Sequence, residues 1–423
     1  MKKLLSKLAL MLVVALIMGL GVAVTAVAAL PDPVVTKNLN MPQHVSVPAG
    51  GLEFQFSFER ISTTPPIAPG VLEIPNQTIS FAAGTPSPAA GFLTGTADFE
   101  SIINANAFRN TPGLNAGTQD WRVREVIPLP AAQVPGMTYD QSEFILRIHF
   151  SNNLDPITQQ PLNPRLNIFA VEVFRTHDRN GAPVTPVPGQ PGIKYNDGLA
   201  FVNTFAPTIG SATEPALTIS KTIGGDDRPY ANLSQLFRFT LALTAPQYPL
   251  PLPPGVTAQP TLPTPIPALI VSGPGAGTQV PTTVERPTSI SIVNGAATFY
   301  LRDGERLRID TLPAGTTYTV TETGVPNFTP NAIVTVGGAP APNVTAPTGQ
   351  DLAASGAVSN LTPPPNNTLD NRADFTNIYH RTIVAGLVLT SSPFFAVGIA
   401  VLGLTLMMAS RSRKRIEEMP IAY

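Results

Sequence analysis

Short stretches of alternating apolar and polar residues run through most of this 423-residue chain, and they limit its fold more than any other feature. The stretches are rich in Val, Ile, Thr and Phe, and turns of Pro, Gly and Asn separate them. Alternation with a period of two is typical of strands that bury one face. The best helical candidate is one short stretch at 96–104. The sequence therefore predicts an all-β protein built from β-sandwiches.

Both ends of the chain resemble targeting segments. Residues 1–29 combine three lysines, a long apolar run and the small residues at 26–28, which favours a secretory signal peptide over an N-terminal anchor. Residues 383–409 form a second apolar run that is long enough for a transmembrane helix. A basic tail at 410–423 follows, which predicts that this end stays in the cytoplasm. We expect an exported protein that is anchored in the membrane at its C-terminus.

The exported part is too long for one typical domain and suits two. A stretch of small residues with Pro and Gly at 206–216 reads as a linker. We therefore expect one β-sandwich domain at 30–205 and a second at 217–380. A Pro-rich stretch at 245–287 is expected to be a surface excursion within the second domain.

Composition argues against several classes of function. The chain has no cysteine, so disulfides do not stabilise its exported part, and its net charge of −1 gives no reason to expect a nucleic-acid partner. The four histidines, His44, His149, His177 and His380, are scattered without metal-ligand spacing. No nucleophile elbow or phosphate loop is present. We expect no metal, no cofactor and no reaction on an external substrate.

Three polar residues of the first domain lie on apolar strand faces. Lys37 shares its face with Val35 and Leu39. Glu125 lies on the face of Trp121 and Val123, and Asn203 on that of Phe201 and Phe205. A register slip or a bulge explains any single case of this kind.

The second domain repeats the set in the same order. Lys221 shares its face with Ile219 and Ile223, Glu322 with Tyr318 and Val320, and Asn377 with Phe375 and Tyr379. Two ordered triplets on matched patterns favour a chemical explanation over two coincidences.

Lys, Glu and Asn are the residue types that a self-catalysed isopeptide bond requires. Burial lowers the pKa of a lysine and leaves it as a neutral nucleophile. A buried carboxyl prefers to be protonated and can shuttle protons. Attack on the Asn side chain expels ammonia and leaves an amide, and the fold supplies the proximity. We predict that Glu125 and Glu322 act as the catalytic acids.

On these residues the chain resembles Gram-positive pilus backbone subunits with collagen-adhesin B-type domains. Residues 34–205 are similar to the streptococcal pilin isopeptide-linkage domain at Val34–Lys37, Phe54–Phe58, Trp121–Val126, Pro135–Asp140 and Phe201–Phe205. Residues 217–379 are similar to its companion domain at Leu217–Lys221, Phe237–Leu241, Leu301–Glu305, Leu312–Glu322 and Phe375–Tyr379. The resemblance implies two tandem inverse immunoglobulin-like sandwiches, with cross-links Lys37–Asn203 and Lys221–Asn377.

The resemblance also implies that a sortase links such subunits to other copies through a lysine. Lys194 is the one exported lysine left over, and it is either this acceptor or an ordinary exposed lysine. The sorting signal departs from the family pattern, because Val384-Ala385-Gly386 stands where Pro-Thr-Gly is expected. Sortase cleavage and transfer to the cell wall therefore stay open.

The expected function is that of a cell-surface structural protein, a pilin-like subunit. The alternative is a non-polymerising adhesin, anchored in the membrane or the wall, that binds a host or matrix ligand.

Overall fold

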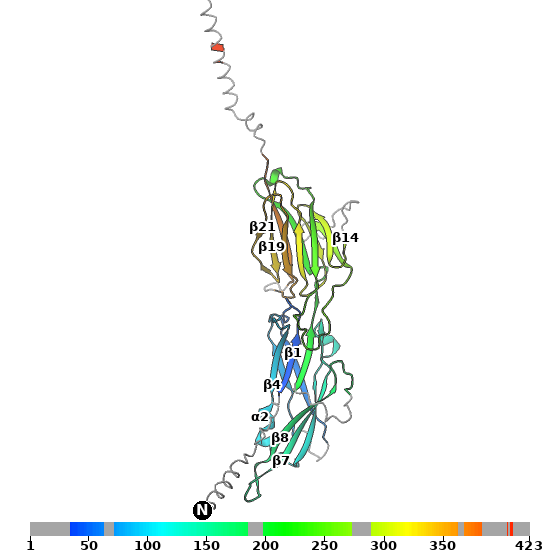
Figure 1. Cartoon of the computed structure of the whole chain (residues 1–423), viewed down its shortest axis with the longest axis vertical. Coiled ribbons are helices and arrows are strands. Elements are labelled where there is room, and N and C mark those ends of the chain that lie inside the picture. Colours follow the sequence, from blue (N-terminus) through cyan, green and yellow to red (C-terminus); the bar gives the residue numbers. More distant parts are fainter. Residues whose placement is uncertain are drawn as a thin grey trace, which may run out of the picture. The chain divides into compact units, whose positions relative to one another are not determined.

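A computed structural model describes residues 34–62, 72–184, 198–272, 289–362 and 368–382, together with positions 404, 407 and 408. It contains two compact units (Figure 1): unit 1 comprises Met1–Thr208 and Pro246–Pro260, and unit 2 comprises Ile209–Ala245 and Thr261–Tyr423. Almost all regular elements are strands, which confirms the all-β prediction. The inverse immunoglobulin-like topology implied by the resemblance stays a prediction.

The predicted targeting segments are not part of this description. The signal peptide at 1–29 and the basic tail at 410–423 lie outside the described residues, as does the apolar run at 383–409 except at the three isolated positions. Within the described part of the chain, no helix has the length and apolar character needed to cross a membrane.

Unit 1 contains two sheets. Its strands are β1 (Val34–Asn40), β2 (Leu52–Arg60), β3 (Gln77–Phe81), β4 (Phe92–Asp98), β5 (Gly117–Glu125), β6 (Met137–Thr138), β7 (Glu143–Leu154), β8 (Pro161–His177) and β9 (Leu199–Phe205). One sheet has the order β4-β1-β9-β6, in which β1 runs parallel to β9 and antiparallel to β4. The other has the order β3-β2-β5-β7-β8 and is antiparallel throughout.

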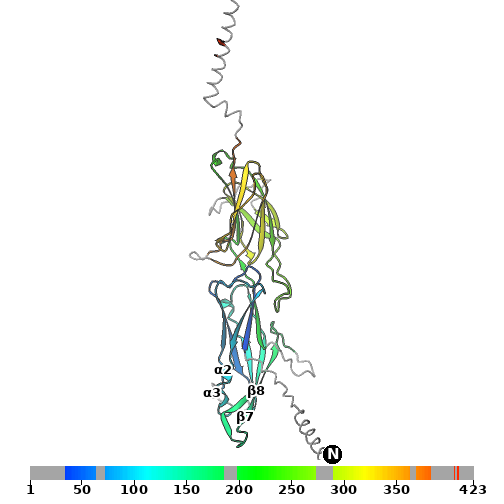
Figure 2. The same ribbon diagram turned by 60° about the vertical axis from the view of Figure 1, so that its left-hand side comes forward.

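Helical structure in unit 1 is limited to α2 (Glu100–Ile103), α3 (Asn106–Arg109) and the 3₁₀ turn Pro130–Ala132. Figure 2 shows α2 and α3 next to each other, and α3 packs against β8. The helix predicted at 96–104 is thus shorter than expected. Antiparallel pairing with β1 keeps the chain extended as far as Asp98, and this tertiary pairing overrides local helix propensity.

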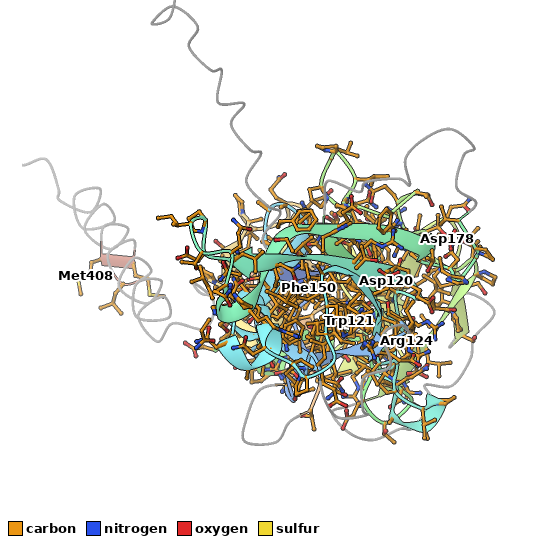
Figure 3. The ribbon with its side chains drawn as sticks, turned by 90° about the horizontal axis from the view of Figure 1, so that it is seen from below. Asp120, Trp121, Arg124, Phe150, Asp178 and Met408 are labelled. Atoms are coloured by element: carbon orange, nitrogen blue, oxygen red, sulfur yellow. The ribbon has the colours of Figure 1, made fainter. Side chains whose placement is uncertain are left out.

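Aromatic side chains fill the core of unit 1. Trp121 and Phe150 are 0% and 1% exposed and lie in the interior in Figure 3, whereas Asp178 lies at the rim. The Phe108 ring stacks on Trp121 with its centroid 6.0 Å away. Trp121 is the only tryptophan of the chain, so its fluorescence reports the folding of unit 1.

Unit 2 is a second two-sheet structure. Its strands are β11 (Leu217–Gly224), β12 (Phe237–Thr244), β13 (Ile266–Ser272), β14 (Ser289–Ile292), β15 (Ala296–Leu301), β16 (Glu305–Ile309), β17 (Leu312–Pro313), β18 (Thr317–Glu322), β19 (Phe328–Val336), β20 (Ala339–Pro340), β21 (Val344–Thr345), β22 (Leu352–Ala357) and β23 (Arg372–Tyr379). Strand β10 (Thr208–Ile209) precedes them, and a 3₁₀ turn spans Arg228–Tyr230.

The two larger sheets of unit 2 have the orders β14-β13-β16-β11-β23-β19-β20, with β21 also on β19, and β15-β12-β18-β22, whereas the two-residue strand β17 pairs with β10. Strand β11 runs parallel to β23 and antiparallel to β16. One hydrophobic cluster takes buried side chains from both sheets, such as Ile219, Phe239, Val320 and Phe375. The two sheets therefore pack face to face over one core.

The connection from β12 to β13 returns to unit 1. Residues Pro246–Pro260, which we call the strap, belong to unit 1 although the strands on either side belong to unit 2. Tyr248 of the strap is 5% exposed, and the Gln43 backbone N–H donates to the Gln247 carbonyl at 2.8 Å. The excursion predicted at 245–287 is therefore wrong in two respects, because 246–260 packs into unit 1 and 266–272 forms β13. A high proline content predicts an irregular chain, but it does not predict which unit that chain packs against.

Candidate functional site

The three polar residues singled out in unit 1 come together between its two sheets. Lys37 on β1 and Asn203 on β9 lie on adjacent parallel strands, and Glu125 reaches them from β5 of the other sheet. In the register of β1 and β9, Asn203 pairs with Leu39, two residues beyond Lys37 on the same face. All three are buried, with exposed fractions of 0% to 5%.

One carboxyl group connects the two nitrogens in this cluster. Lys37 Nζ lies 2.5 Å from Glu125 Oε2, and Asn203 Nδ2 donates to Glu125 Oε1 at 2.7 Å. The same acid thus contacts the nucleophile through one oxygen and the nitrogen of the carboxamide through the other. This carboxyl group can take up a proton from one nitrogen on one oxygen and give a proton to the other nitrogen from its second oxygen.

Unit 2 repeats the arrangement with the same strand register. Asn377 on β23 pairs with Ile223, again two residues beyond Lys221 on β11, and Glu322 reaches both from β18 of the facing sheet. Lys221 Nζ lies 3.0 Å from Glu322 Oε1 and 3.2 Å from Oε2. Asn377 Nδ2 donates to Glu322 Oε1 at 2.5 Å. All three residues are 1% exposed.

Burial shifts the acid–base equilibria of both pairs toward their neutral forms. Desolvation lowers the pKa of Lys37 and of Lys221 to about 8, although the nearby carboxylate opposes the shift. Desolvation also raises the pKa of Glu125 and of Glu322, against the opposing effect of the lysines. Both shifts increase the share of a neutral amine next to a protonated acid, which is the state that amide formation needs.

Phenylalanine rings enclose both lysines. The Lys37 Nζ lies 4.7 Å from the centroid of the Phe54 ring, and the Lys221 Nζ lies 4.3 Å from that of Phe237. Each ring belongs to a Phe-x-Phe pair on the strand next to the one that carries the Glu. These rings help to bury the lysine amines. The sequence comparison quoted both Phe-x-Phe pairs but assigned them no role.

The carboxamide oxygens of the two clusters have different surroundings. Asn203 Oδ1 accepts a hydrogen bond from the backbone N–H of Asp140 at 2.7 Å. Asn377 Oδ1 is buried and has no hydrogen-bond partner among the described residues. Strand alternation does not indicate this contact, and the one local signal for Asp140 is its Asx-turn spacing to Ser142.

The unit 1 cluster lies close to an open pocket of about 560 Å³, which Glu125, Asp140 and Ser142 help to line.

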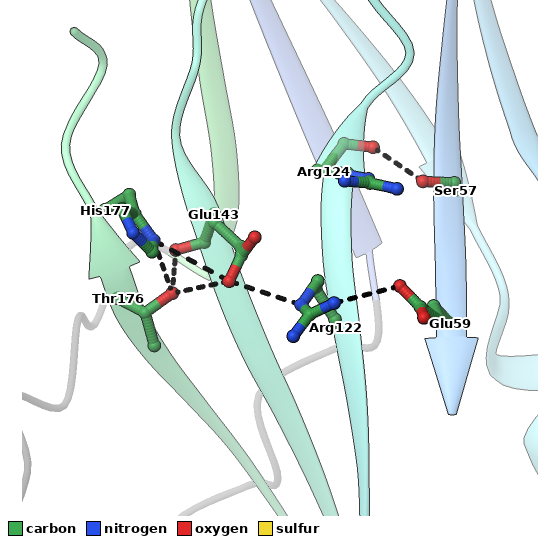
Figure 4. A network of polar contacts seen from close by, with 7 residues as sticks. All are labelled: Ser57, Glu59, Arg122, Arg124, Glu143, Thr176 and His177. Carbon is green, nitrogen blue, oxygen red and sulfur yellow. Dashed lines mark hydrogen bonds and ion pairs between the residues drawn. The ribbon is translucent and has the colours of Figure 1, made fainter. Parts of the chain in front are cut away.

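The outer face of the sheet that carries Glu125 bears a polar network (Figure 4). Arg122 bridges Glu59 at 3.1 Å and Glu143 at 3.3 Å. The Thr176 hydroxyl and the His177 ring also contact the Glu143 carboxylate. These groups are partly exposed, so the network contributes little to stability.

The remaining predicted residues fall outside the described chain. The candidate acceptor Lys194 lies in 185–197, and the altered sorting signal at Val384–Gly386 lies beyond residue 382. Among the described residues, no group of three or more His, Asp or Glu side chains is arranged to hold a metal ion.

Comparison with known families and structures gives three findings. A family model described as a domain of unknown function (DUF7601) matches residues 215–351, which fall within the part of the chain that forms unit 2 and the strap. A search of curated proteins found no match.

Several solved structures superpose weakly. The major pilin of Streptococcus pyogenes is 18% identical, with 83% of this chain and 99% of the pilin covered and a TM-score of 0.31. The T3.2 major pilin of S. pyogenes is 16% identical, with the same coverage and a TM-score of 0.29. A pilus-presented adhesin is 10% identical over 82% of this chain and 100% of the adhesin, with a TM-score of 0.23.

Proposed function

We propose that this chain is an exported structural protein of the cell surface, a pilin-like subunit whose two β units each form their own Lys–Asn isopeptide bond. The bonds join Lys37 to Asn203 and Lys221 to Asn377. One observation supports this above all: in both units a buried glutamate bridges the lysine Nζ and the asparagine Nδ2.

The proposed reaction runs in each cluster without any added group. The neutral Lys37 amine attacks Cγ of Asn203 and forms a tetrahedral intermediate. Glu125 takes a proton from Nζ on one oxygen and gives its own proton to Nδ2 from the other. The Cγ–Nδ2 bond then breaks, ammonia leaves, and an Nζ–Cγ amide remains. The acid ends in its starting protonation state, and Glu322 does the same for Lys221 and Asn377.

The mechanical consequence follows from the topology. Each bond links two adjacent parallel strands, β1 with β9 in unit 1 and β11 with β23 in unit 2. In each pair one strand comes first and the other last among the strands named for that unit. A pulling force on the chain would then be carried by these covalent bonds, and the hydrogen bonds of the sheets would bear less of it. By analogy with disulfides that close long loops, each link would stabilise its unit by roughly 4–5 kcal/mol.

Peptide mapping tests the chemistry. A protease digest of the purified chain should contain a branched peptide that joins the Lys37 and Asn203 segments, lighter than their sum by one ammonia, and a second for Lys221 and Asn377. Lys37→Arg should remove the first and leave the second. Unlinked peptides from both units of the wild type would reject the proposed bonds.

The surface role rests on the predicted export signal at 1–29, the apolar run at 383–409 and the motif-level resemblance to pilus subunits. Polymerisation would need a sortase that accepts the Val-Ala-Gly variant, and Lys194 is the candidate acceptor. A denaturing gel of cell-envelope extract separates the possibilities. A ladder that disappears in Lys194→Ala supports a polymer joined at this lysine, whereas a single band supports an anchored adhesin.

A further inference from the structure

The two clusters differ at the carboxamide oxygen, and the difference has a structural cause. In unit 1, Asp140 lies just after the two-residue strand β6 and is 2% exposed. Its carboxylate accepts the backbone N–H of Ser142 at 2.8 Å and that of Val202 at 2.6 Å. Asp140 therefore fastens its own turn to β9 at the residue directly before Asn203.

The short length of β6 makes this contact possible. Strand β6 pairs with β9 only at Thr204 and Phe205, so the ladder stops before it reaches Val202. The Asp140 carboxylate takes over as the acceptor for the next N–H. Held in this way, the Asp140 backbone N–H points at Asn203 Oδ1, 2.7 Å away.

This N–H fixes the carboxamide from its oxygen side. An N–H donor can satisfy Oδ1 but would repel the NH₂ group, so the oxygen turns to Asp140 and Nδ2 turns to Glu125. That orientation presents the leaving nitrogen to the acid. As the lysine attacks, negative charge develops on Oδ1, and a fixed N–H donor at this distance stabilises it.

Unit 2 has no equivalent contact among its described residues. Strand β19 pairs with β23 without a break from Tyr379 to Arg372, so no turn like that of Asp140 interrupts the ladder next to Asn377. The buried Asn377 Oδ1 has no hydrogen-bond partner among these residues. Its carboxamide is held only through Nδ2 and Glu322.

We propose that Asp140 is a positioning residue for bond formation in unit 1, acting through its backbone N–H on the Asn203 amide, and that unit 1 therefore closes its bond faster than unit 2. This inference rests on the proposed function. Removing a comparable donor typically slows a reaction of this kind by about 100-fold.

Pulse-labelled cell-free translation of the full chain tests the inference. Samples are quenched in denaturant at successive times and digested, and the two branched peptides are quantified separately. In wild type, the Lys37–Asn203 peptide should accumulate first. In Asp140→Ala its formation should slow by about 10- to 100-fold, because the turn loses its anchor. Asp140→Asn keeps one acceptor and should lie between the two. The Lys221–Asn377 peptide is the internal reference and should not change.

A purely structural role is tested in parallel. The Asp140 variants are also made with Asn203→Ala, which cannot form the bond, and Trp121 fluorescence reports whether unit 1 is folded. Slowed linkage in a folded unit 1 supports the inference. Unchanged linkage in Asp140→Ala overturns it. The inference also fails if linkage is slowed only in those Asp140 variants whose Trp121 fluorescence shows that unit 1 is unfolded. Absence of both peptides from wild type would instead reject the proposed function.

Discussion

Unit 1 and unit 2 place the same three side chains at the same strand register but surround them differently. In each, the asparagine pairs two residues beyond the lysine on a parallel neighbour, and the glutamate comes from the opposite sheet. The residue that pairs with the lysine on its other side is Gly95 in unit 1 and the buried Glu305 in unit 2. The features shared by both units are those that the proposed chemistry requires. The differences lie in the neighbouring chain, next to β1 and β9 in unit 1 and next to β11 and β23 in unit 2.

The comparison also separates orientation from proximity. Both units bring nucleophile, acid and amide into one dry cluster, so both have the proximity that the reaction needs. Only unit 1, among the described residues, also holds the amide oxygen through Asp140. Differences between the units in rate would report on orientation, whereas differences in stability would report on the links and on packing.

The largest effect is expected from removal of one link. Asn203→Ala should lower the free energy of unfolding of unit 1 by roughly 4–5 kcal/mol, because the unfolded chain regains the freedom of a closed span of 166 residues between Lys37 and Asn203. Urea unfolding followed by Trp121 fluorescence measures this loss. The exposed Asn180→Ala is the matched control and should have little effect. A loss no larger than that of the control would indicate that no link forms in unit 1.

A smaller loss of stability is expected when the strap is altered. The loss should fall on unit 1, although the strap lies between two strands of unit 2 in the sequence. Tyr248→Ala should destabilise unit 1 by about 3 kcal/mol, since it removes a buried aromatic ring. The Trp121 transition should shift although residue 248 lies between two strands of unit 2. Leu250→Ala changes a strap residue that is 80% exposed and should leave the transition in place. Equal behaviour of the two variants would contradict the assignment of the strap to unit 1.

A pH effect distinguishes a linked lysine from a free one. In Asn203→Ala, Lys37 stays titratable, with its pKa lowered by burial from 10.5 to about 8. Between these values the unfolded chain binds more protons than the folded chain, so the stability of the variant should rise with pH from about 8 to 10.5. Wild type has no free Lys37 amine once the bond has formed and should lack this rise. Parallel curves from Trp121-detected unfolding would show that Lys37 is free in both.

The smallest effect is expected on the outer face of the strand that carries Glu125. Arg122→Ala removes the ion pairs to Glu59 and Glu143, whose side chains are 53% and 22% exposed. Solvent-screened pairs of this kind contribute less than about 1 kcal/mol, and the loss should shrink further at high salt. Trp121-detected unfolding at two salt concentrations measures it. A loss of several kcal/mol would mean that the outer network, more than the buried cluster, holds unit 1 together.

Strand alternation was enough to predict which side chains point inward. Lys37 alternates with Val35 and Leu39, and Glu125 with Trp121 and Val123, so their burial was legible from neighbours two positions away. The likeness of the two triplets then indicated a common chemistry.

Contacts between residues far apart in the sequence could not be predicted from local patterns. Asp140 lies 63 residues from Asn203 and reaches it only because β6 is two residues long, which no local pattern states. The strap is Pro-rich, and its composition predicts an irregular chain without indicating that Tyr248 is buried in unit 1. The predicted helix at 96–104 includes residues 96–98, which are part of a strand. Local helix propensity does not take their long-range pairing with β1 into account.

The most direct test of the central claim is the intact mass of the purified chain beside its Glu125→Gln and Glu322→Gln variants. These substitutions keep the shape and burial of each acid but remove its proton shuttle. After correction for the substitution, wild type should lack two ammonia molecules relative to its sequence, and each variant should lack one, with the remaining bond mapped to the unaltered unit. A wild-type mass without any deficit, or variants with the same deficit as wild type, would contradict the claim that each glutamate drives a bond in its own unit.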